Sequence, residues 1–343
     1  MFDDDVLRIL ERRLGTSLTF TDPPVRLSGG FWAAIWTFGI AGGGARWDAP
    51  LVLRVMPDAF AARREIAVQR AVAELGFPTP RVLLDGEDAA LGGAFMVMPK
   101  APGTAPLGGL DLGISGLIRL PGALRRLPGR LASVAAELHA LDPASIADAF
   151  ADVGGVPGTD LRRQQIRAAA RTAADGFDAL DRWFDDHPPA IAAPVVSHGD
   201  LHPFNLLVEN DEVTVLDWTN ANLLPAEFDL GFTVALLRCA PMTAPRLLRP
   251  VIRRLTAWLA DSFVRRYAAA RPGWLLDPAA LAWFEALQHG RCLAEVVSAR
   301  QGLSTIVGAS HPFETSADAM LSRIHRLTGI TLTLPPRLPA PAG

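Results

Sequence analysis

The sequence predicts an α+β protein with two lobes, a small N-terminal lobe built on an antiparallel sheet and a larger, mainly helical C-terminal lobe. Three observations favour this architecture. The chain has 343 residues, which corresponds to about two domains. Half of the residues are hydrophobic and 20% are charged, so a sizeable core can be buried. Strand-like runs separated by glycines dominate up to residue 98, whereas helical periodicity dominates beyond residue 109.

The predicted N-terminal lobe comprises residues 1–98 and begins with a short helix over residues 3–14. Apolar spacing predicts a second helix over residues 58–75, which Gly76 and Pro78 end. Its apolar face also carries a carboxylate, that of Glu65. Five strands of one antiparallel sheet are expected over residues 25–27, 31–40, 51–56, 82–84 and 95–98.

A hinge or linker is expected over residues 99–109, because proline and glycine are frequent there. Residues 110–333 then form the predicted helical lobe. Within it, helices are expected around residues 131–141 and over residues 160–187, 226–240, 246–270 and 278–303, and short β runs over residues 195–197, 206–208 and 213–216. Residues 334–343 hold four prolines and are predicted to be a disordered tail.

Composition excludes several classes of function. The net charge of −3 and the pI of about 6.2 give no support for a nucleic-acid or anionic-membrane partner. Lys100 is the single lysine among 33 basic residues, so neither a lysine-containing phosphate loop nor lysine chemistry elsewhere is possible. The N-terminus is acidic, and the two cysteines, Cys239 and Cys292, have no metal-binding spacing. We therefore expect a cytoplasmic protein with free thiols.

The most informative segment runs from His198-Gly-Asp-Leu-His-Pro-Phe to Asn205 and on to Asp217-Trp218. Two apolar β runs flank a polar turn centred on residue 211, so we expect a hairpin that pairs Asn205 with Asp217. An amide oxygen and a carboxylate would then converge, as suits Mg²⁺. Asp200 precedes this pair on a loop and is a candidate base or hydroxyl-orienting group.

Asp200, Asn205 or Asp217 taken alone could simply form a turn. The expected convergence of all three favours a functional site. His198 is expected to tie loop backbone together. For His202 two interpretations stay open, loop packing or contact with a phosphate or metal-bound water. His198, Asp200 and His202 could also be ligands of a metallophosphoesterase, but such sites need further His and Asp clusters, and the other histidines are scattered singly.

The motif His198-Gly-Asp-Leu-His-Pro-x-x-Asn, followed by Leu216-Asp-Trp, resembles the signature of the aminoglycoside phosphotransferase and choline kinase-like family. These are small-molecule kinases with a protein-kinase-like fold. The resemblance implies that Asp200 orients or deprotonates the acceptor hydroxyl and that Asn205 and Asp217 hold Mg²⁺. It also implies that Asp229 braces the catalytic loop.

The same resemblance implies an ATP site in the small lobe. Arg54 stands on a strand where the family places a basic residue for the α- and β-phosphates. Glu65 supports this independently, because a carboxylate on an apolar helix face is costly unless it is paired. We therefore predict an Arg54–Glu65 ion pair. Ser28, Gly29 and Gly30 resemble the family's glycine-containing loop between the first two strands, and Met98 lies in the hinge-like segment expected to contact adenine.

The sequence thus predicts an ATP- and Mg²⁺-dependent phosphotransferase acting on a hydroxyl of a small molecule. Gly199 stands where protein kinases commonly carry an arginine, so a protein acceptor is not expected. The alternative is a kinase-like protein that binds ligands without phosphotransfer. The acceptor stays open. An acidic cluster could bind a cationic antibiotic, and aromatic residues could line an apolar pocket. These sets are Asp175, Asp178, Asp181, Asp185 and Asp186, and Trp274, Trp283 and Phe284.

Overall fold

A computed structural model describes residues 2–27, 33–107, 114–151, 158–172, 174–190, 192–240, 247, 249–303 and 311–337. The chain divides into two compact units. The first comprises Met1–Ala105, Ala144–Gly155 and Asn205–Ala221, and the second comprises Pro106–Pro143, Val156–Phe204 and Asn222–Gly343. The segment after Phe204, expected in the helical lobe, thus belongs with the sheet.

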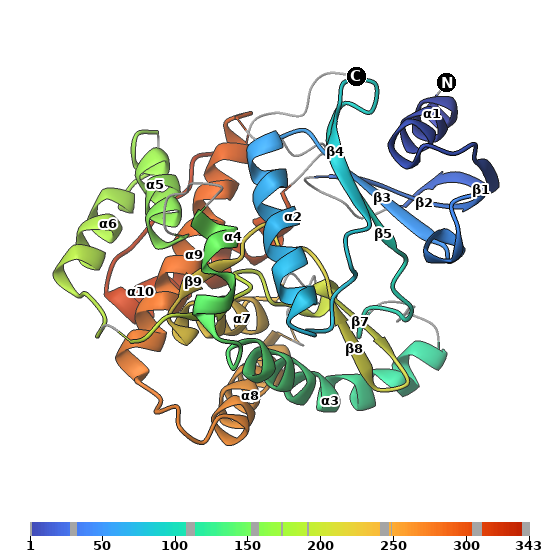
Figure 1. The fold of residues 1–343 in the computed structure, drawn as a ribbon. Coiled ribbons are helices and arrows are strands. Elements are labelled where there is room, and N and C mark those ends of the chain that lie inside the picture. Colours follow the sequence, from blue (N-terminus) through green and yellow to red (C-terminus); the bar gives the residue numbers. More distant parts are fainter. Residues whose placement is uncertain are drawn as a thin grey trace. The chain divides into compact units, whose positions relative to one another are not determined.

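The first unit is built on a five-stranded antiparallel sheet, which confirms the predicted number and direction of strands (Figure 1). The strands are β1 (Thr19–Arg26), β2 (Ala34–Ala41), β3 (Leu51–Met56), β4 (Leu84–Asp88) and β5 (Gly93–Pro99), in the order β1-β2-β3-β5-β4. β1 begins earlier than predicted, because two β-bulges between Phe20 and Val25 interrupt the alternation that marks a strand. β4 begins at Leu84, the residue at which its predicted counterpart ends.

Two helices pack against the sheet, α1 (Phe2–Leu14) and α2 (Ala59–Glu74). Successive strand residues point to opposite faces, so the apolar residues of β3 and β5 fall into two clusters. Leu53 of β3 and Phe95 of β5 share a cluster with Ile9 of α1, whereas Met56 and Met96 share one with α2. Arg54 lies between Leu53 and Val55 in β3 and therefore points to the face that α2 covers.

A β-hairpin of β7 (Leu206–Glu209) and β8 (Glu212–Val215) also belongs to the first unit. Its turn residues Asn210 and Asp211 have φ angles of 49° and 69°, as in a two-residue type I′ turn. Leu206 consequently faces Val215, and Asn205 accepts a hydrogen bond at 2.9 Å from the backbone of Leu216. The predicted pairing of Asn205 with Asp217 is therefore wrong by one residue. Smaller elements here are the 3-10 helix Ala45–Trp47 and α4 (Ala147–Ala151).

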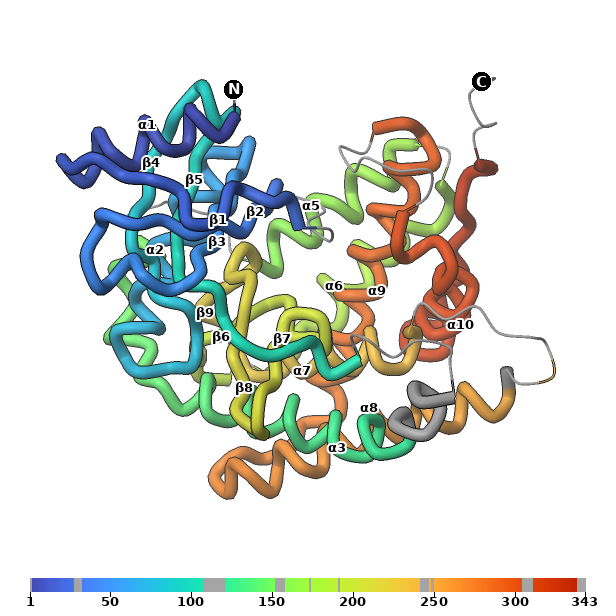
Figure 2. The backbone as a smooth tube through the Cα atoms, turned by 90° about the vertical axis from the view of Figure 1, so that its right-hand side faces the viewer, coloured from blue at the N-terminus to red at the C-terminus, as the bar shows by residue number. Residues whose placement is uncertain are grey.

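The second unit is mainly helical, as predicted. Its helices are α3 (Ile114–Leu138), α5 (Gly158–Ala170), α6 (Phe177–Asp186), α7 (Ala226–Arg238), α8 (Arg249–Ala270), α9 (Pro278–Arg300) and α10 (Ala317–Thr328). The single helix predicted over residues 160–187 is two helices, because the chain turns at the left-handed Gly176 (φ 84°) that precedes α6. α3 and α8 lie side by side (Figures 1 and 2). Shorter elements are Pro143–Ile146, Pro203–Asn205 and Pro312–Ser316, all 3-10 helices.

Helix α9 is the centre of this unit and contacts α5, α7 and α10. Gly231 of α7 permits the close approach to α9, since a Cβ there would lie 2.8 Å from the backbone of Phe284. β6 (Val195–Ser197) pairs with β9 (Asn222–Leu224) and delivers the chain to His198. The packing thus fixes the strand from which the catalytic-loop motif begins.

Other sequence expectations can be compared directly with the described residues. Cys239 and Cys292 are free and buried. None of the described helices is long and apolar enough to cross a membrane. The disorder predicted from residue 334 is wrong for its first residues, because Arg300 donates to the Pro335 carbonyl at 2.7 Å and Arg337 pairs with Glu314. Residues 338–343 lie outside the described part.

Candidate active site

In the first unit, Arg54 and Glu65 form the predicted ion pair. Arg54 Nη2 donates to Glu65 Oε2 at 3.3 Å, and Nε lies 3.2 Å from Oε1 without the alignment of a hydrogen bond. The same Nη2 lies 3.1 Å from Asp217 Oδ2. The strand, the helix α2 and the segment after the hairpin therefore bring one guanidinium and two carboxylates together.

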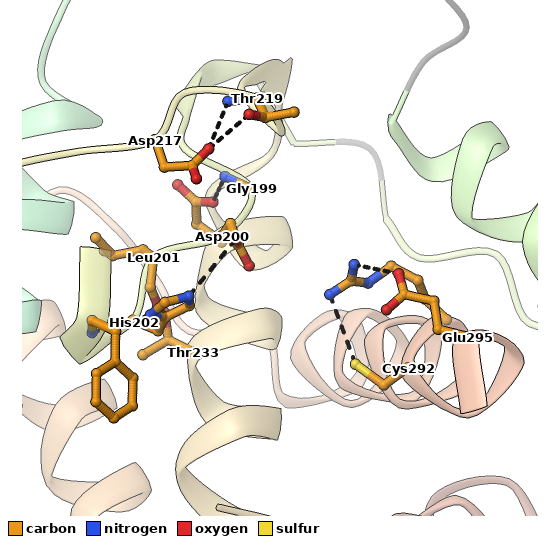
Figure 3. Close-up of polar contacts among 12 residues, drawn as sticks. Gly199, Asp200, Leu201, His202, Asp217, Thr219, Thr233, Cys292 and Glu295 are labelled. Carbon is orange, nitrogen blue, oxygen red and sulfur yellow. Dashed lines mark hydrogen bonds and ion pairs between the residues drawn. The ribbon is translucent and has the colours of Figure 1, made fainter. Parts of the chain in front are cut away.

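Thr219 links the two carboxylates. Its hydroxyl lies 2.7 Å from Asp217 Oδ1 and 2.9 Å from Glu65 Oε2, and Figure 3 shows the contact with Asp217. A hydroxyl carries one proton, so Thr219 can donate to only one carboxylate at a time. Protonated Glu65 could donate the second hydrogen bond to the Thr219 oxygen. Thr219 was not singled out from the sequence, where its only signal is a hydroxyl two residues after Asp217.

Burial and the neighbouring charges shift the pKa values of Glu65 and Arg54. Burial raises the pKa of Glu65 to about 7; the Arg54 charge opposes this, and the Asp217 charge reinforces it. Burial also disfavours the charged form of Arg54, but the charges of Glu65 and Asp217 outweigh it and raise the pKa of this guanidinium. Arg54 thus contacts two carboxylates, and their charges and burial together set the pKa values of the cluster.

The segment that carries Asp217 is anchored on both sides. Asp217 has a φ of 67°, in the left-handed region that a non-glycine residue rarely adopts. Trp218 is fully buried, packs edge to face on Phe77, and donates from Nε1 to Thr79 Oγ1 at 2.9 Å. The Val215 backbone donates to the Pro78 carbonyl at 2.8 Å. These contacts let Asp217 hold a conformation that hairpin pairing alone would not give.

The residues present suit Mg²⁺. Among the described residues, no three His, Cys, Asp or Glu side chains gather in a way that could hold a metal by themselves. Mg²⁺ characteristically uses one or two protein oxygens and completes its shell with water and substrate phosphates. Asp217 offers a carboxylate that is 30% exposed. Asn205, 9% exposed, offers an amide oxygen at the base of the same hairpin.

The other predicted nucleotide contacts are only partly described. Met98 is buried on β5, opposite Val52 of β3, and its sulfur accepts a hydrogen bond from Gln69 at 3.5 Å. Its side chain therefore lies on the same face of the sheet as Arg54. Ser28, Gly29 and Gly30 lie outside the described residues, so the predicted glycine loop stays a prediction.

In the second unit, Asp229 of α7 holds the start of the catalytic loop. Its carboxylate accepts hydrogen bonds from the backbone of His198 at 2.7 Å and of Gly199 at 2.5 Å. Although burial alone would raise it, the pKa of Asp229 lies below its usual range because His139 and these donors stabilise the carboxylate. Asp229 thus has the bracing position that the family resemblance implied.

His139 and Tyr267 extend this buried network and were not predicted from the sequence. His139 Nε2 lies 3.0 Å from Asp229 Oδ2, and Nδ1 lies 2.8 Å from the Tyr267 hydroxyl. Both side chains are almost fully buried, and they lie far from Asp229 in the sequence: His139 follows α3 directly, and Tyr267 lies on α8. No local pattern marks such a contact, because it depends on how α3, α7 and α8 pack.

Asp200 lies just beyond the braced backbone and is partly exposed, with a side-chain exposure of 22%. Its Oδ2 lies 3.8 Å from His202 Nε2, and His202 Nδ1 accepts a hydrogen bond from the Phe204 backbone at 3.2 Å. Thr233 of α7 holds the intervening Leu201 carbonyl at 2.8 Å. Figure 3 shows these residues on one loop beside α7. His202 therefore combines loop packing with a position beside the candidate base.

Comparison with known proteins identifies the class. The family model of the phosphotransferase enzyme family matches residues 28–288, and the chain therefore belongs to this family. Among curated proteins it is similar to acyl-CoA dehydrogenase family member 10 of Mus musculus, 28% identical over 203 residues, which are 54% of this chain and 18% of that protein. It is also 28% identical to acyl-CoA dehydrogenase family member 11 of Gallus gallus over 174 residues, 48% and 21% of the two chains. The chain thus spans about a fifth of these relatives.

Solved structures give the fold. A Ralstonia eutropha protein assigned to the aminoglycoside phosphotransferases matches with a TM-score of 0.67 and 19% identity, covering 95% of this chain and 98% of that one. The macrolide 2′-phosphotransferase of Brachybacterium faecium matches with a TM-score of 0.53 and 20% identity, covering 92% and 98%. The protein therefore belongs to the phosphotransferase enzyme family and has the kinase-like α+β fold of the aminoglycoside phosphotransferases.

Proposed function

We propose that the protein transfers the γ-phosphoryl group of ATP, in the presence of Mg²⁺, to a hydroxyl of a small molecule. The observation that carries this proposal is the cluster of Arg54, Glu65, Asp217 and Thr219, in which two carboxylates share one guanidinium. Such a cluster suits a bound cation together with phosphates better than it suits a purely structural role. One related phosphotransferase was solved with AMP-PNP and hygromycin B, which supports nucleotide use.

Each residue has a defined role in this proposal. Arg54 contacts phosphate oxygens, and Glu65 orients its guanidinium. Asp217 and Asn205 hold Mg²⁺, which supplies charge neutralisation to the phosphates when bound. Asp200 accepts a hydrogen bond from the acceptor hydroxyl and takes its proton as the new O–P bond forms, while the bond from the γ-phosphorus to the β–γ bridging oxygen breaks and ADP leaves with that oxygen.

The acceptor is proposed only as a class, a hydroxylated small molecule. The acidic cluster considered for a cationic antibiotic is largely neutralised, because Asp181 and Asp185 pair with Arg163, and Asp178 pairs with Arg182. Two of the aromatic residues considered for an apolar pocket, Trp283 and Phe284, pack instead in the buried core of the second unit. Neither set of residues favours one acceptor.

We also propose that the protein is cytoplasmic. The two buried free thiols support this location.

The test is ATP consumption and product mass with a panel of sugars, hydroxy acids, amino alcohols, aminoglycosides and macrolides, comparing wild type with Asp200→Asn. We expect one acceptor class to gain a phosphoryl group with wild type and not with Asp200→Asn. If the protein binds Mg-ATP tightly but consumes no ATP, either with any tested acceptor or in the absence of an acceptor, the result would favour a binding protein without catalysis.

A further inference from the structure

The catalytic loop is also held from the side opposite Asp229, by a buried arginine. Arg162 of α5 donates from Nη2 to the Gly199 carbonyl at 3.1 Å. Gly199 has a φ of 76°, a left-handed turn immediately before Asp200. Asp229 therefore holds the amide of Gly199 and Arg162 holds its carbonyl, so that both peptide groups of this residue are fixed.

Arg162 is itself held by its own helix and by two others, α7 and α9. Its Nε donates to Gln288 of α9 at 2.9 Å, and Nη1 donates to the Gly158 carbonyl at 3.2 Å. The guanidinium carbon lies 4.5 Å from the centre of the Phe228 ring on α7. The side chain is 2% exposed. This planar group joins α5, α7, α9 and the loop, a geometry that requires the fork of an arginine.

Arg162 makes no ion pair with another described residue, which is unusual for so buried a cation. Burial lowers the pKa of Arg162 to about 9, and the like charge of Arg291 adds to this. Asp200 provides the largest of the opposing charges. The guanidinium thus stays protonated at neutral pH, and the carboxylate that most favours its charge is the candidate base.

We propose that Arg162 is a positioning residue of the reaction: by holding the Gly199 carbonyl, it fixes the orientation from which Asp200 meets the acceptor hydroxyl. This inference rests on the proposed phosphotransferase function. The hydrogen bonds of Arg162 lie within the second unit, and in this role it does not contact the acceptor. Its removal should therefore slow the chemical step without weakening ATP binding.

The experiment compares Arg162→Met with Arg167→Met, which removes an arginine from the same helix whose described partner is Asp181. For Arg162→Met we expect kcat to fall by about 10- to 100-fold, with KM for ATP within about twofold of wild type. Hydrogen exchange should accelerate in the peptide covering residues 196–204 and stay unchanged in α2. Arg167→Met should match wild type in both measurements.

Two further variants keep the test decisive if Arg162→Met does not fold. Arg162→Lys keeps the charge but cannot hydrogen-bond to Gln288, Gly158 and Gly199 at the same time. Gln288→Leu removes one of the hydrogen-bond partners that orient the guanidinium. Both should give intermediate kcat values and intermediate exchange in the loop. Wild-type kcat and wild-type loop exchange in these variants would overturn the proposal, as would faster exchange spread evenly over α5, α7 and α9. If wild type transfers no phosphoryl group, the proposed function fails, and loop exchange alone still decides whether Arg162 holds the loop.

Discussion

Two buried glutamates, one in each unit, have opposite electrostatic surroundings. Glu65 shares Arg54 with Asp217, and burial raises its pKa to about 7. Burial also acts on Glu285, but Arg323 binds both of its oxygens, at 2.6 and 2.8 Å, and together with His289 and Arg238 lowers its pKa to about 2. Glu285 thus contacts two arginines, whereas Glu65 contacts an arginine that also contacts a second carboxylate, Asp217.

This difference separates a stabilising ion pair from a binding site. Glu285 joins α9 to α7 through Arg238 and to α10 through Arg323. These two arginines neutralise its charge in the free protein. In the cluster around Glu65, two carboxylates contact the same arginine, and in the proposed function Mg²⁺ would bind at Asp217. The predictions below test the comparison from the largest expected effect to the smallest.

The largest effect is expected at Asp200, for which we propose a catalytic role and which belongs to neither glutamate cluster. Asp200→Asn or Asp200→Ala should lower kcat by about 10²–10⁴-fold, because the acceptor hydroxyl loses its base, while ATP binding survives. Single-turnover phosphoryl transfer measures the loss. A variant that keeps more than about a tenth of the wild-type kcat would exclude this role for Asp200.

Arg54 is expected to affect both binding and folding. Arg54→Ala should raise KM for ATP by at least about tenfold and reduce the free energy of unfolding by about 3 kcal/mol, because Glu65 is left without its cation on a buried helix face. Arg54→Lys should raise KM less, since an ammonium cannot contact Glu65 and phosphate with a planar fork. Steady-state kinetics and urea unfolding provide the two numbers. Arg54→Ala with wild-type KM would contradict the nucleotide role.

Glu285→Gln should act on stability alone. Removing this charge breaks a bidentate ion pair, and we expect a loss of about 2 kcal/mol with kcat and KM unchanged for the folded enzyme. The folded pKa lies below the unfolded one, so this contribution is present above pH 4.5 and is lost as the pH falls towards 2. Denaturation at several pH values measures it. A change in KM for ATP would contradict a purely structural role for Glu285.

Glu65→Gln should have the smallest effect on stability and the opposite pH dependence. Because the folded pKa of Glu65 is raised from 4.5 to about 7, the folded protein binds a proton that the unfolded chain releases. Wild type should therefore lose stability as the pH rises from about 4.5 to 7, and Glu65→Gln should remove this slope. Parallel stability curves for the two proteins over this range would disprove the raised pKa.

The sequence predicted those parts of the molecule that depend on local patterns or on charge. The alternating strands and the helix α2 follow from periodicity. The cost of a carboxylate on an apolar helix face indicated that Glu65 is paired, and the family resemblance supplied Arg54 as its partner. The register of the hairpin did not follow, since a polar segment of four residues does not reveal that its turn contains only Asn210 and Asp211. Arg162 could not be found at all, because its partners lie on elements up to 126 residues away.

The central claim is that the cluster around Arg54 is a magnesium–nucleotide site, and calorimetry tests it most directly. ATP is titrated into wild type and Asp217→Asn, with Mg²⁺ or with EDTA. Asp85→Asn is the matched control, because Asp85 also pairs with an arginine in the first unit at a similar side-chain exposure, 34% against 30%. We expect Mg²⁺ to strengthen ATP binding in wild type and in Asp85→Asn but not in Asp217→Asn. ATP affinity that does not depend on Mg²⁺ in wild type, or that is unchanged in Asp217→Asn, would contradict the claim.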